Sequence, residues 1–326
     1  MKWSTILKIS LDGMHIILYN GLCESIKTAI VKEIVMKNII PRIAAIHDLS
    51  GFGRCSLTVI IPILSAMGMQ VCPLPTAVLS THTGGFENYT FVDLTDHMEG
   101  FLEHWKSLNI RFNCIYSGFL GSPRQISIVA DFIKTFHQED QLVIVDPVLG
   151  DDGKTYDTFG DEMIQRMGEL IRYADIITPN ITEAAFLLNE SYPEHMEETK
   201  LKSWLLRLAD KGPKTVIITS VPDNLSKNKT AVVAYNAKDK RFWKVSCDYI
   251  PANYPGTGDI FTSVLAGSLL EGDSLPIALD RAVQFVSMAI RATFGYDYPV
   301  REGVLIERIL PNLKAPVISS SYQILE

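Results

Sequence analysis

The sequence predicts an α/β fold in three layers, in which helices cover both faces of a mostly parallel central sheet. Short apolar segments alternate with segments of helical periodicity along most of the chain. The short segments are apolar throughout, which is typical of strands buried on both faces. Polar residues gather where these strands end, at Asp48, Ser117, Asp146, Asn180 and Thr219. Ligands bind outside the carboxyl ends of strands in such sheets, so this clustering indicates a site.

The first half of the domain supplies most of the predicted strands. Residues 42–48 form a buried strand, and a helix interrupted at Pro62 follows it and reaches Gly68. Residues 71–85 are extended and rich in Pro and Thr, which suits an edge strand or a flap better than a central strand. The remaining elements of this half are helices at 95–106 and 123–136, a strand and loop at 113–122, and a buried strand at 141–147.

The second half continues the alternation. A strand at 174–180 leads into a helix that begins near Thr182, and a further strand is predicted at 215–220. Residues 231–235 and 241–245 form a predicted hairpin. Two helices close the domain, one beginning at Asp259 and one over 275–293.

Composition limits the classes of protein. The 326 residues are 47% hydrophobic and 21% charged, with a net charge of −7 and no cluster of Lys and Arg on a predicted helix face. These values favour a globular protein and argue against nucleic acid as a partner. No apolar run approaches the length of a membrane span, and we expect a cytoplasmic protein. The five scattered cysteines form no Cys-x-x-Cys pair, so we expect buried free thiols.

The amino-terminal residues 1–35 are assigned to an extension of uncertain role, because a natural domain start follows at Met36. Within the extension, residues 24–36 can form an amphipathic helix, which leaves a docking arm as an alternative. Residues 36–326 are expected to form one domain.

The chain is organised around residues 253–267, Asn-Tyr-Pro-Gly-Thr-Gly-Asp-Ile-Phe-Thr-Ser-Val-Leu-Ala-Gly. Gly256 and Gly258 can adopt positive φ, and the apolar residues after Asp259 have helical spacing. The loop N–H groups therefore lie at a helix N-terminus, where an anion is favoured. Transfer of a phosphoryl group needs such a cradle beside a carboxylate. The structural alternative is an ordinary loop in which Asp259 caps the helix.

Two further motifs place acidic residues at the ends of predicted elements. Asp146 ends a buried strand, where a carboxylate is costly unless it meets a cation or donors. Asn180 and Glu183 are three residues apart at a helix start, which brings an amide and a carboxylate to one face. A simple cap at Asp146 and a capping arrangement at Asn180 and Glu183 are the alternatives.

Two segments resemble nucleotide-binding motifs but lack residues that those motifs require. Gly51-Phe-Gly53 lacks the third glycine of the dinucleotide fingerprint, because Ser56 stands there, and no acidic residue closes a second strand. Gly153-Lys154-Thr155 is not a P-loop, since Val148 replaces the first glycine, and Lys154 is expected in a solvated turn.

Over about residues 40 to 312 the chain resembles the ribokinase-like superfamily. The motifs Asp146-Pro-Val-Leu-Gly, Asn180-x-x-Glu183 and Gly256-Thr-Gly-Asp259 follow in that superfamily's order. The segments Pro73–Thr83 and Tyr116–Ser122 are similar to the substrate-side segments of pyridoxal (pyridoxine, pyridoxamine) kinases. The resemblance implies phosphorylation of the 5′-hydroxymethyl group of a vitamin B6 vitamer by MgATP. It leaves open a need for a monovalent cation, and it implies a homodimer only by analogy.

The resemblance also implies roles for individual residues. Asp259 would take the hydroxyl proton, and Gly256, Thr257 and Gly258 would cradle the transferring phosphoryl group. Other residues would serve the metal (Asp146, Glu183 and Asn180), ATP (Asn180, Thr219 and Ser220) and the pyridine ring (Asp48, Thr76, His82 and Tyr116).

Alternatives remain for the ring side and for the substrate. His82 can be a hydrogen-bonded flap residue and Tyr116 a core aromatic residue, while Asp48 stands where related kinases often carry a small hydroxyl residue. A hydroxymethylpyrimidine kinase of thiamine synthesis would share the fold and chemistry, but those enzymes tend to carry Cys at the position of Asp259. A sugar kinase and a non-catalytic vitamer-binding protein fit the motifs less well.

Overall fold

The computed structural model describes residues 7–11, 14–18, 40–156, 159–193, 195–222, 229–315 and 320–325. The chain divides into two compact units, Met1–Pro41 and Arg42–Glu326. In the first unit, β1 (Leu7–Leu11) and β2 (Met14–Leu18) pair as an antiparallel hairpin. The helix expected over 24–36 lies outside the described residues, and the division between 35 and 36 stays a prediction.

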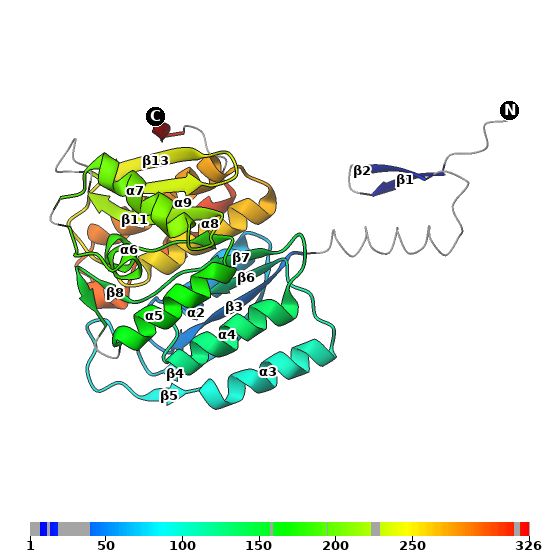
Figure 1. Cartoon of the computed structure of the whole chain (residues 1–326), viewed down its shortest axis with the longest axis horizontal. Coiled ribbons are helices and arrows are strands. Elements are labelled where there is room, and N and C mark those ends of the chain that lie inside the picture. The colour runs from blue at the N-terminus through cyan, green and yellow to red at the C-terminus, as the bar shows by residue number, and fades with distance from the viewer. Residues whose placement is uncertain are drawn as a thin grey trace. The chain divides into compact units, whose positions relative to one another are not determined.

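Ten strands of the described part of the second unit form one sheet (Figure 1). The six strands from β11 to β4 run parallel, and antiparallel strands extend the sheet at both edges. In spatial order the strands are β14 (Tyr322–Leu325), β13 (Arg241–Asp248), β12 (Lys229–Asn236), β11 (Thr215–Pro222), β10 (Ile176–Ile177), β7 (Leu142–Val145), β6 (Cys114–Ser117), β3 (Arg42–Ser50), β4 (Gln70–Leu79) and β5 (Phe91–Asp93).

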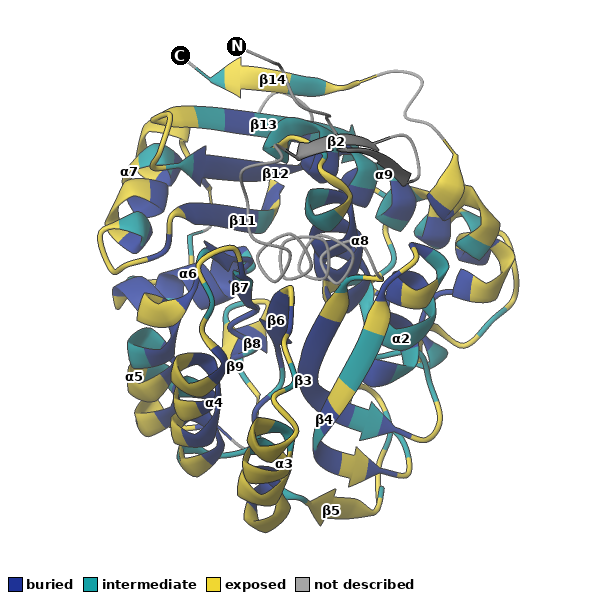
Figure 2. Cartoon of the chain, turned by 90° about the vertical axis from the view of Figure 1, so that its right-hand side faces the viewer, coloured by how far each residue is buried: buried dark blue, intermediate teal, exposed yellow. Residues whose placement is uncertain are grey.

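Helices cover both faces of this sheet and enclose two hydrophobic cores. One face packs against α3 (Thr95–Ser107), α4 (Pro123–Phe136), α5 (Asp161–Leu170), α6 (Ile181–Leu188) and α7 (Glu198–Ala209). The opposite face packs against α2 (Leu57–Ala66), α8 (Thr257–Glu271) and α9 (Leu275–Phe294). Alternate residues of β3 enter the two cores, Ala44 and Ile46 on the first face and Ile43 and Ala45 on the second. The central strands are accordingly buried along their length (Figure 2).

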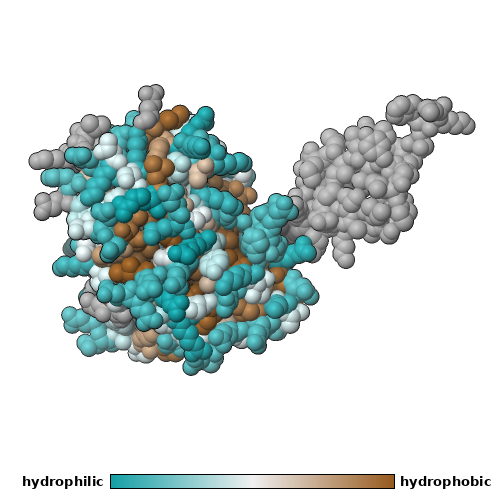
Figure 3. Space-filling model, in the orientation of Figure 1, coloured by the Kyte–Doolittle hydropathy of each residue, from teal (hydrophilic) through white to brown (hydrophobic). Residues whose placement is uncertain are grey.

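The predicted three-layer α/β architecture is confirmed. The surface side chains of the outer helix faces are mostly hydrophilic on the side seen in Figure 3. In the described residues, no helix has an apolar stretch that would suffice for a membrane span. Shorter elements complete the chain, namely β8 (Gly150–Asp151), β9 (Lys154–Thr155) and 3-10 turns at Ile171–Tyr173, Val300–Glu302, Ile306–Arg308 and Leu310–Lys314.

Several elements were not predicted. The amphipathic spacing of Leu201, Trp204, Leu205 and Leu208 on α7 could have been recognised, since all four are buried. In contrast, β5 has only three residues, and all three are exposed, so no apolar pattern marks it. The strand predicted at 174–180 is also too long, because only Ile176 and Ile177 pair as a strand there.

The prolines of β4 fit the prediction that this segment is an edge strand or a flap. Pro73 and Pro75 align with β3 on one side, but β5 pairs only with the later residues 77–79. Among the described strands, residues 70–76 therefore form an edge, where a missing N–H leaves no ladder partner unsatisfied.

The four described cysteines are free thiols, as expected. However, only Cys114 is buried, and Cys55, Cys72 and Cys247 are half-buried.

The buried side chain of Gln125 joins three elements beside the strand ends. Its Nε2 donates to the Thr76 carbonyl at 3.0 Å and to the Thr95 hydroxyl at 2.9 Å. Its Oε1 accepts the Gly121 N–H at 2.7 Å. The residue thereby ties β4 and α3 to the loop that follows β6.

We predict that Gln125→Leu lowers the free energy of unfolding by about 2–4 kcal/mol, because the substitution leaves buried polar groups without hydrogen-bond partners. Urea unfolding would measure this loss, with Thr135→Ala on the exposed side of α4 as the control. A loss no greater than that of the control would contradict the role assigned to Gln125.

Candidate active site

The topology of the sheet predicts a binding crevice at the carboxyl ends of β3 and β6. The chain proceeds from β3 to β4 on one side and then returns to β6 on the other side of β3. Crossover connections consequently leave in opposite directions at this point, which opens a crevice outside the strand ends. Asp48 lies near the end of β3, and Asp146 follows β7, which pairs with β6 on the side away from β3.

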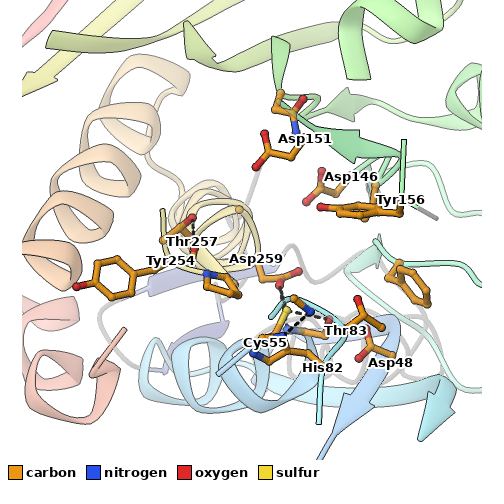
Figure 4. Close-up of a pocket in the computed structure, with 18 of the residues that line it drawn as sticks. Asp48, Cys55, His82, Thr83, Asp146, Asp151, Tyr156, Tyr254, Thr257 and Asp259 are labelled. Carbon is orange, nitrogen blue, oxygen red and sulfur yellow. Dashed lines mark hydrogen bonds between the residues drawn. The ribbon is translucent and has the colours of Figure 1, made fainter. Parts of the chain in front are cut away.

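A cavity of about 1050 Å³ occupies this position. Carboxylates from separate segments of the chain face it (Figure 4). Lys154 is the only Lys or Arg among the described residues that line it. The acidic residues of the wall are Asp48, Glu87, Asp146, Asp151, Glu183 and Asp259.

The N-terminus of α8 opens onto the cavity. Gly256 is the N-cap with φ of +80°, and a Cβ there would collide with the carbonyl oxygen of Arg54. This position therefore requires glycine. Gly258 lies inside the first turn without a positive φ, so the expectation of two left-handed glycines was wrong for the second. The first N–H groups of α8 have no acceptor within the helix, which suits an anion.

Asp259 is the third residue of α8, and its carboxylate binds another segment instead of capping its own helix. Its Oδ2 accepts the Ser56 N–H at 2.9 Å and the Cys55 thiol at 3.5 Å. The alternative of a capping aspartate is therefore wrong. Burial, and to a smaller degree the charge of Asp48, raises the pKa of Asp259 to about 6. A carboxylate with such a pKa can accept a proton near neutral pH.

Two more acids lie on the opposite wall. Burial and then the charge of Asp259 raise the pKa of Asp146 to about 8. Burial and then the charge of Asp146 raise the pKa of Glu183 well above its usual value. Mutual repulsion of buried carboxylates is relieved by a cation, so the residues present fit a metal ion.

The cation would take most of its ligands from outside the protein. In the described residues, no three His, Cys, Asp or Glu side chains are grouped closely enough to enclose a metal ion. Mg²⁺ commonly keeps several waters and binds through one or two carboxylates together with phosphate oxygens. Asp146 and Glu183 are therefore the candidates to hold a hydrated Mg²⁺.

Asn180 and Glu183 form the capping box that was considered as the structural alternative. Asn180 Oδ1 accepts the Glu183 N–H at 2.9 Å, and Glu183 Oε2 accepts the Asn180 N–H at 2.8 Å. Glu183 Oε1 also accepts the Leu149 N–H at 3.1 Å. Both residues line the cavity, so the capping box is part of the candidate site.

The ring-side residues divide into two groups. Asp48 and His82 line the cavity, whereas Thr76 and Tyr116 are fully buried and absent from its wall. The Thr76 hydroxyl donates to the Phe119 carbonyl at 3.1 Å, which leaves it a supporting position. Tyr116 belongs to the hydrophobic core under α8, the alternative stated for it from the sequence.

His82 is a hydrogen-bonded residue of the flap, as its alternative stated. Its Nδ1 accepts the Gly84 N–H at 3.1 Å, so its Nε2 carries the proton and donates to the Arg301 carbonyl at 2.7 Å. Both ring nitrogens are thereby occupied, and the ring can meet a ligand only by contact. Phe86 packs edge-on against the ring at 5.0 Å.

The expected ATP-side residues Thr219 and Ser220 line the cavity together with Asn180. A bulge in β11 lies between Ile218 and Val221, and Ser220 has φ of +58° there. Thr219 forms an isolated parallel bridge with Asn180, which holds these residues side by side.

Several wall residues were missed from the sequence. Ser56 replaces a fingerprint glycine and was used only to reject a motif, yet its N–H holds Asp259. Lys154 was expected in a solvated turn; it is exposed on β9 but lines the cavity. Cys55 and Tyr156 also line it, and no local pattern marks either residue.

Comparison with known proteins matches residues 61–301 to the phosphomethylpyrimidine kinase family. This chain belongs to that family. A candidate phosphomethylpyrimidine kinase of Bacteroides thetaiotaomicron, solved in a form with pyridoxal, is 57% identical with a TM-score of 0.85 and covers 88% of this chain and 100% of its own.

Other proteins similar to this chain are named pyridoxal kinases. The pyridoxal kinase structure from Lactobacillus plantarum is 30% identical, with a TM-score of 0.78, over 84% of this chain and 97% of its own. The pyridoxal kinase of Arabidopsis thaliana is 28% identical over 252 residues, or 72% of this chain and 78% of its own. These likenesses confirm the ribokinase-like resemblance stated from the motifs.

The raised pKa of Asp146 predicts a pH-dependent effect of Asp146→Asn on stability. The unfolded side chain ionises near pH 4, whereas the folded one keeps its proton until about pH 8. Folded protein therefore binds the extra proton, and stability falls as pH rises between these values. We expect the melting temperature of Asp146→Asn, relative to the unchanged chain, to increase from pH 5 to pH 8 without metal.

Thermal melts in a chelating buffer would measure the difference. Asp131→Asn on exposed α4 is the matched control. A difference between Asp146→Asn and the unchanged chain that stays constant with pH would contradict the raised pKa.

Proposed function

We propose that this protein is an ATP-dependent pyridoxal kinase that phosphorylates the 5′-hydroxymethyl group of pyridoxal, pyridoxine or pyridoxamine. The observation that carries the proposal is the position of Asp259. Its buried carboxylate lies at the helix N-terminus that is open to an anion, in the same cavity as Asp146 and Glu183. The 57% identical relative solved with pyridoxal and the pyridoxal kinases among the relatives support the choice of substrate.

In the proposed reaction, the hydroxymethyl oxygen attacks the γ-phosphorus of ATP, and the bond from that phosphorus to the bridging oxygen of ADP breaks. Asp259 takes the hydroxyl proton as the new P–O bond forms. The N–H groups of Gly256, Thr257 and Gly258 face the charge on the transferring group. Because phosphoryl transfer needs alignment and charge neutralisation more than covalent help, these groups suffice for its protein side.

The remaining wall residues receive supporting roles. Asp146 and Glu183 would hold Mg²⁺, which neutralises phosphate charge when bound. Asn180, Thr219 and Ser220 would lie along ATP. On the substrate side, Asp48 would hydrogen-bond the vitamer, and the ring of His82 would pack against it.

Three broader features belong to the same proposal. A homodimer and a cytoplasmic location are inferred by analogy with B6 kinases and from the composition. A requirement for a monovalent cation can be tested by measuring the kinase activity with and without added K⁺.

The second candidate is a hydroxymethylpyrimidine kinase, which the name of the family model favours. Enzymes of that kind resemble this chain but tend to carry Cys where Asp259 stands. In addition, a substrate that already carries a phosphate would meet the acidic wall described above, where Lys154 is the single Lys or Arg among the described residues. Charge therefore favours an unphosphorylated substrate.

A coupled assay of ADP release decides between the candidates. The substrates are the three vitamers, hydroxymethylpyrimidine and its monophosphate, each with Mg²⁺ and with chelator. We expect kcat/KM for at least one vitamer to exceed that for either pyrimidine by tenfold or more, and we expect no turnover without Mg²⁺. A preference for a pyrimidine would overturn the assignment.

Asp259→Asn tests the proposed base. We expect kcat to fall by about 10²–10⁴-fold with little change in pyridoxal binding, because the amide cannot accept the proton. In the unchanged enzyme, kcat/KM should fall as pH drops below about 6, where Asp259 becomes protonated. Steady-state rates from pH 5 to 8 and calorimetric binding of pyridoxal provide the data.

Asp131→Asn, a distant exposed acid, is the control for this variant as well. Near-normal turnover by folded Asp259→Asn would remove Asp259 from the role of base.

A further inference from the structure

His47 is a completely buried histidine directly behind Asp259. It precedes Asp48 on β3 and lies on the same face of the strand as Ala45, which packs in the core under α8. Its Nδ1 is 3.9 Å from Oδ1 of Asp259. The sequence analysis did not single it out.

The ring is packed firmly, yet its nitrogens are not satisfied. It lies edge-on to Tyr116 with the ring centroids 4.3 Å apart, and a Cβ on Gly118 would collide with its Nδ1 edge. Neither Nδ1 nor Nε2 has a hydrogen-bond partner among the described residues. Unpaired buried polar groups are uncommon and costly, so such a ring calls for an explanation.

The ring is uncharged at neutral pH. Burial lowers the pKa of His47 to about 3, and a weak contact with the Tyr116 main chain, outside hydrogen-bond geometry, opposes only part of this shift. A neutral imidazole carries one N–H, and its two tautomers differ in which nitrogen donates.

Asp259 has one oxygen in use and one free. Ser56 and Cys55 both donate to its Oδ2. No hydrogen bond reaches Oδ1 within the described part of the chain, and His47 Nδ1 faces it. A buried carboxylate that must be ionised to act as a base needs donors on its oxygens. The ring nitrogen that lacks a partner can therefore serve as the donor for the carboxylate oxygen that lacks one.

We propose that His47 is a positioning residue that donates its Nδ1–H to Oδ1 of Asp259 and so keeps this carboxylate ionised and aimed at the substrate hydroxyl. The proposal rests on the proposed kinase function. An approach of about 1 Å from the observed separation brings the two atoms to hydrogen-bond distance. The opposite tautomer would instead turn a lone pair of Nδ1 toward the carboxylate.

The tautomer can be observed in the unchanged protein by ¹⁵N NMR of labelled histidines. Because burial lowers the pKa of both His47 and His82, His47 would be recognised as the ring that remains neutral at pH 5 and whose resonances stay in place in His82→Gln. We expect its Nδ1 to carry the proton, and we expect Asp259→Asn to shift that resonance. A proton on Nε2, or no response to Asp259→Asn, would overturn the proposal.

Kinetics test the consequence for turnover. In His47→Asn the amide nitrogen replaces the Nδ1 donor, whereas His47→Leu removes it. We expect His47→Leu to lower kcat about 10- to 100-fold at unchanged KM for pyridoxal and ATP, since hydrogen bonds to charged groups have this magnitude. His47→Asn should retain kcat within about threefold. Ile46→Leu, on the opposite face of β3, is the control for altered packing.

The outcomes separate this inference from the function on which it rests. Equal kcat in His47→Leu and the unchanged enzyme, or an equal loss in the Asn and Leu variants, would overturn the positioning role. If the unchanged chain phosphorylates none of the vitamers, the proposed substrate fails, while the NMR experiment still tests the bond between His47 and Asp259. The NMR experiment on the unchanged chain also decides the matter if a His47 variant does not fold.

Discussion

The hydrogen bond from the Ser56 main chain to the Asp259 carboxylate is the contact on which the site depends. It joins the loop after β3 to the start of α8, across 203 residues of sequence. Gly256 allows this approach, because only glycine fits against the Arg54 carbonyl at that turn. The same small contact surface thus fixes the carboxylate and the exposed N–H groups of the helix start together.

The acidic wall of the cavity carries a cost that the fold must bear. Burial raises the pKa of Asp146, Glu183 and Asp259, which works against ionisation in the free protein. A neighbouring charge adds to each shift, namely Asp259 at Asp146, Asp146 at Glu183 and Asp48 at Asp259. Main-chain donors offset part of this cost at Glu183 and Asp259. Arrangements of this kind are frequent at functional sites, where groups are held ready for a ligand that completes their charge balance.

The fold and much of the site could be predicted from the sequence, because both follow from local patterns. Apolar strands, helical spacing and the Gly-Thr-Gly-Asp motif are visible in short windows, and the polar residues at strand ends follow from parallel topology. His47 and Ser56 could not be found in that way, since their importance comes from contact with a distant segment. Tyr116 was misplaced because strand alternation turns it toward the core under α8. The capping box shows a different limit, since the two residues that cap α6 also line the cavity.

The order of segments in the second hydrophobic core has a consequence for synthesis of the chain. That core combines α2, which leaves the ribosome early, with α8 and α9 near the carboxyl end. Until the last quarter of the polypeptide has emerged, apolar residues such as Ile43 and Leu64 cannot pack against α8 and α9. One face of the sheet therefore stays exposed in the nascent chain, and during that interval avoiding aggregation depends on dilution or on chaperones.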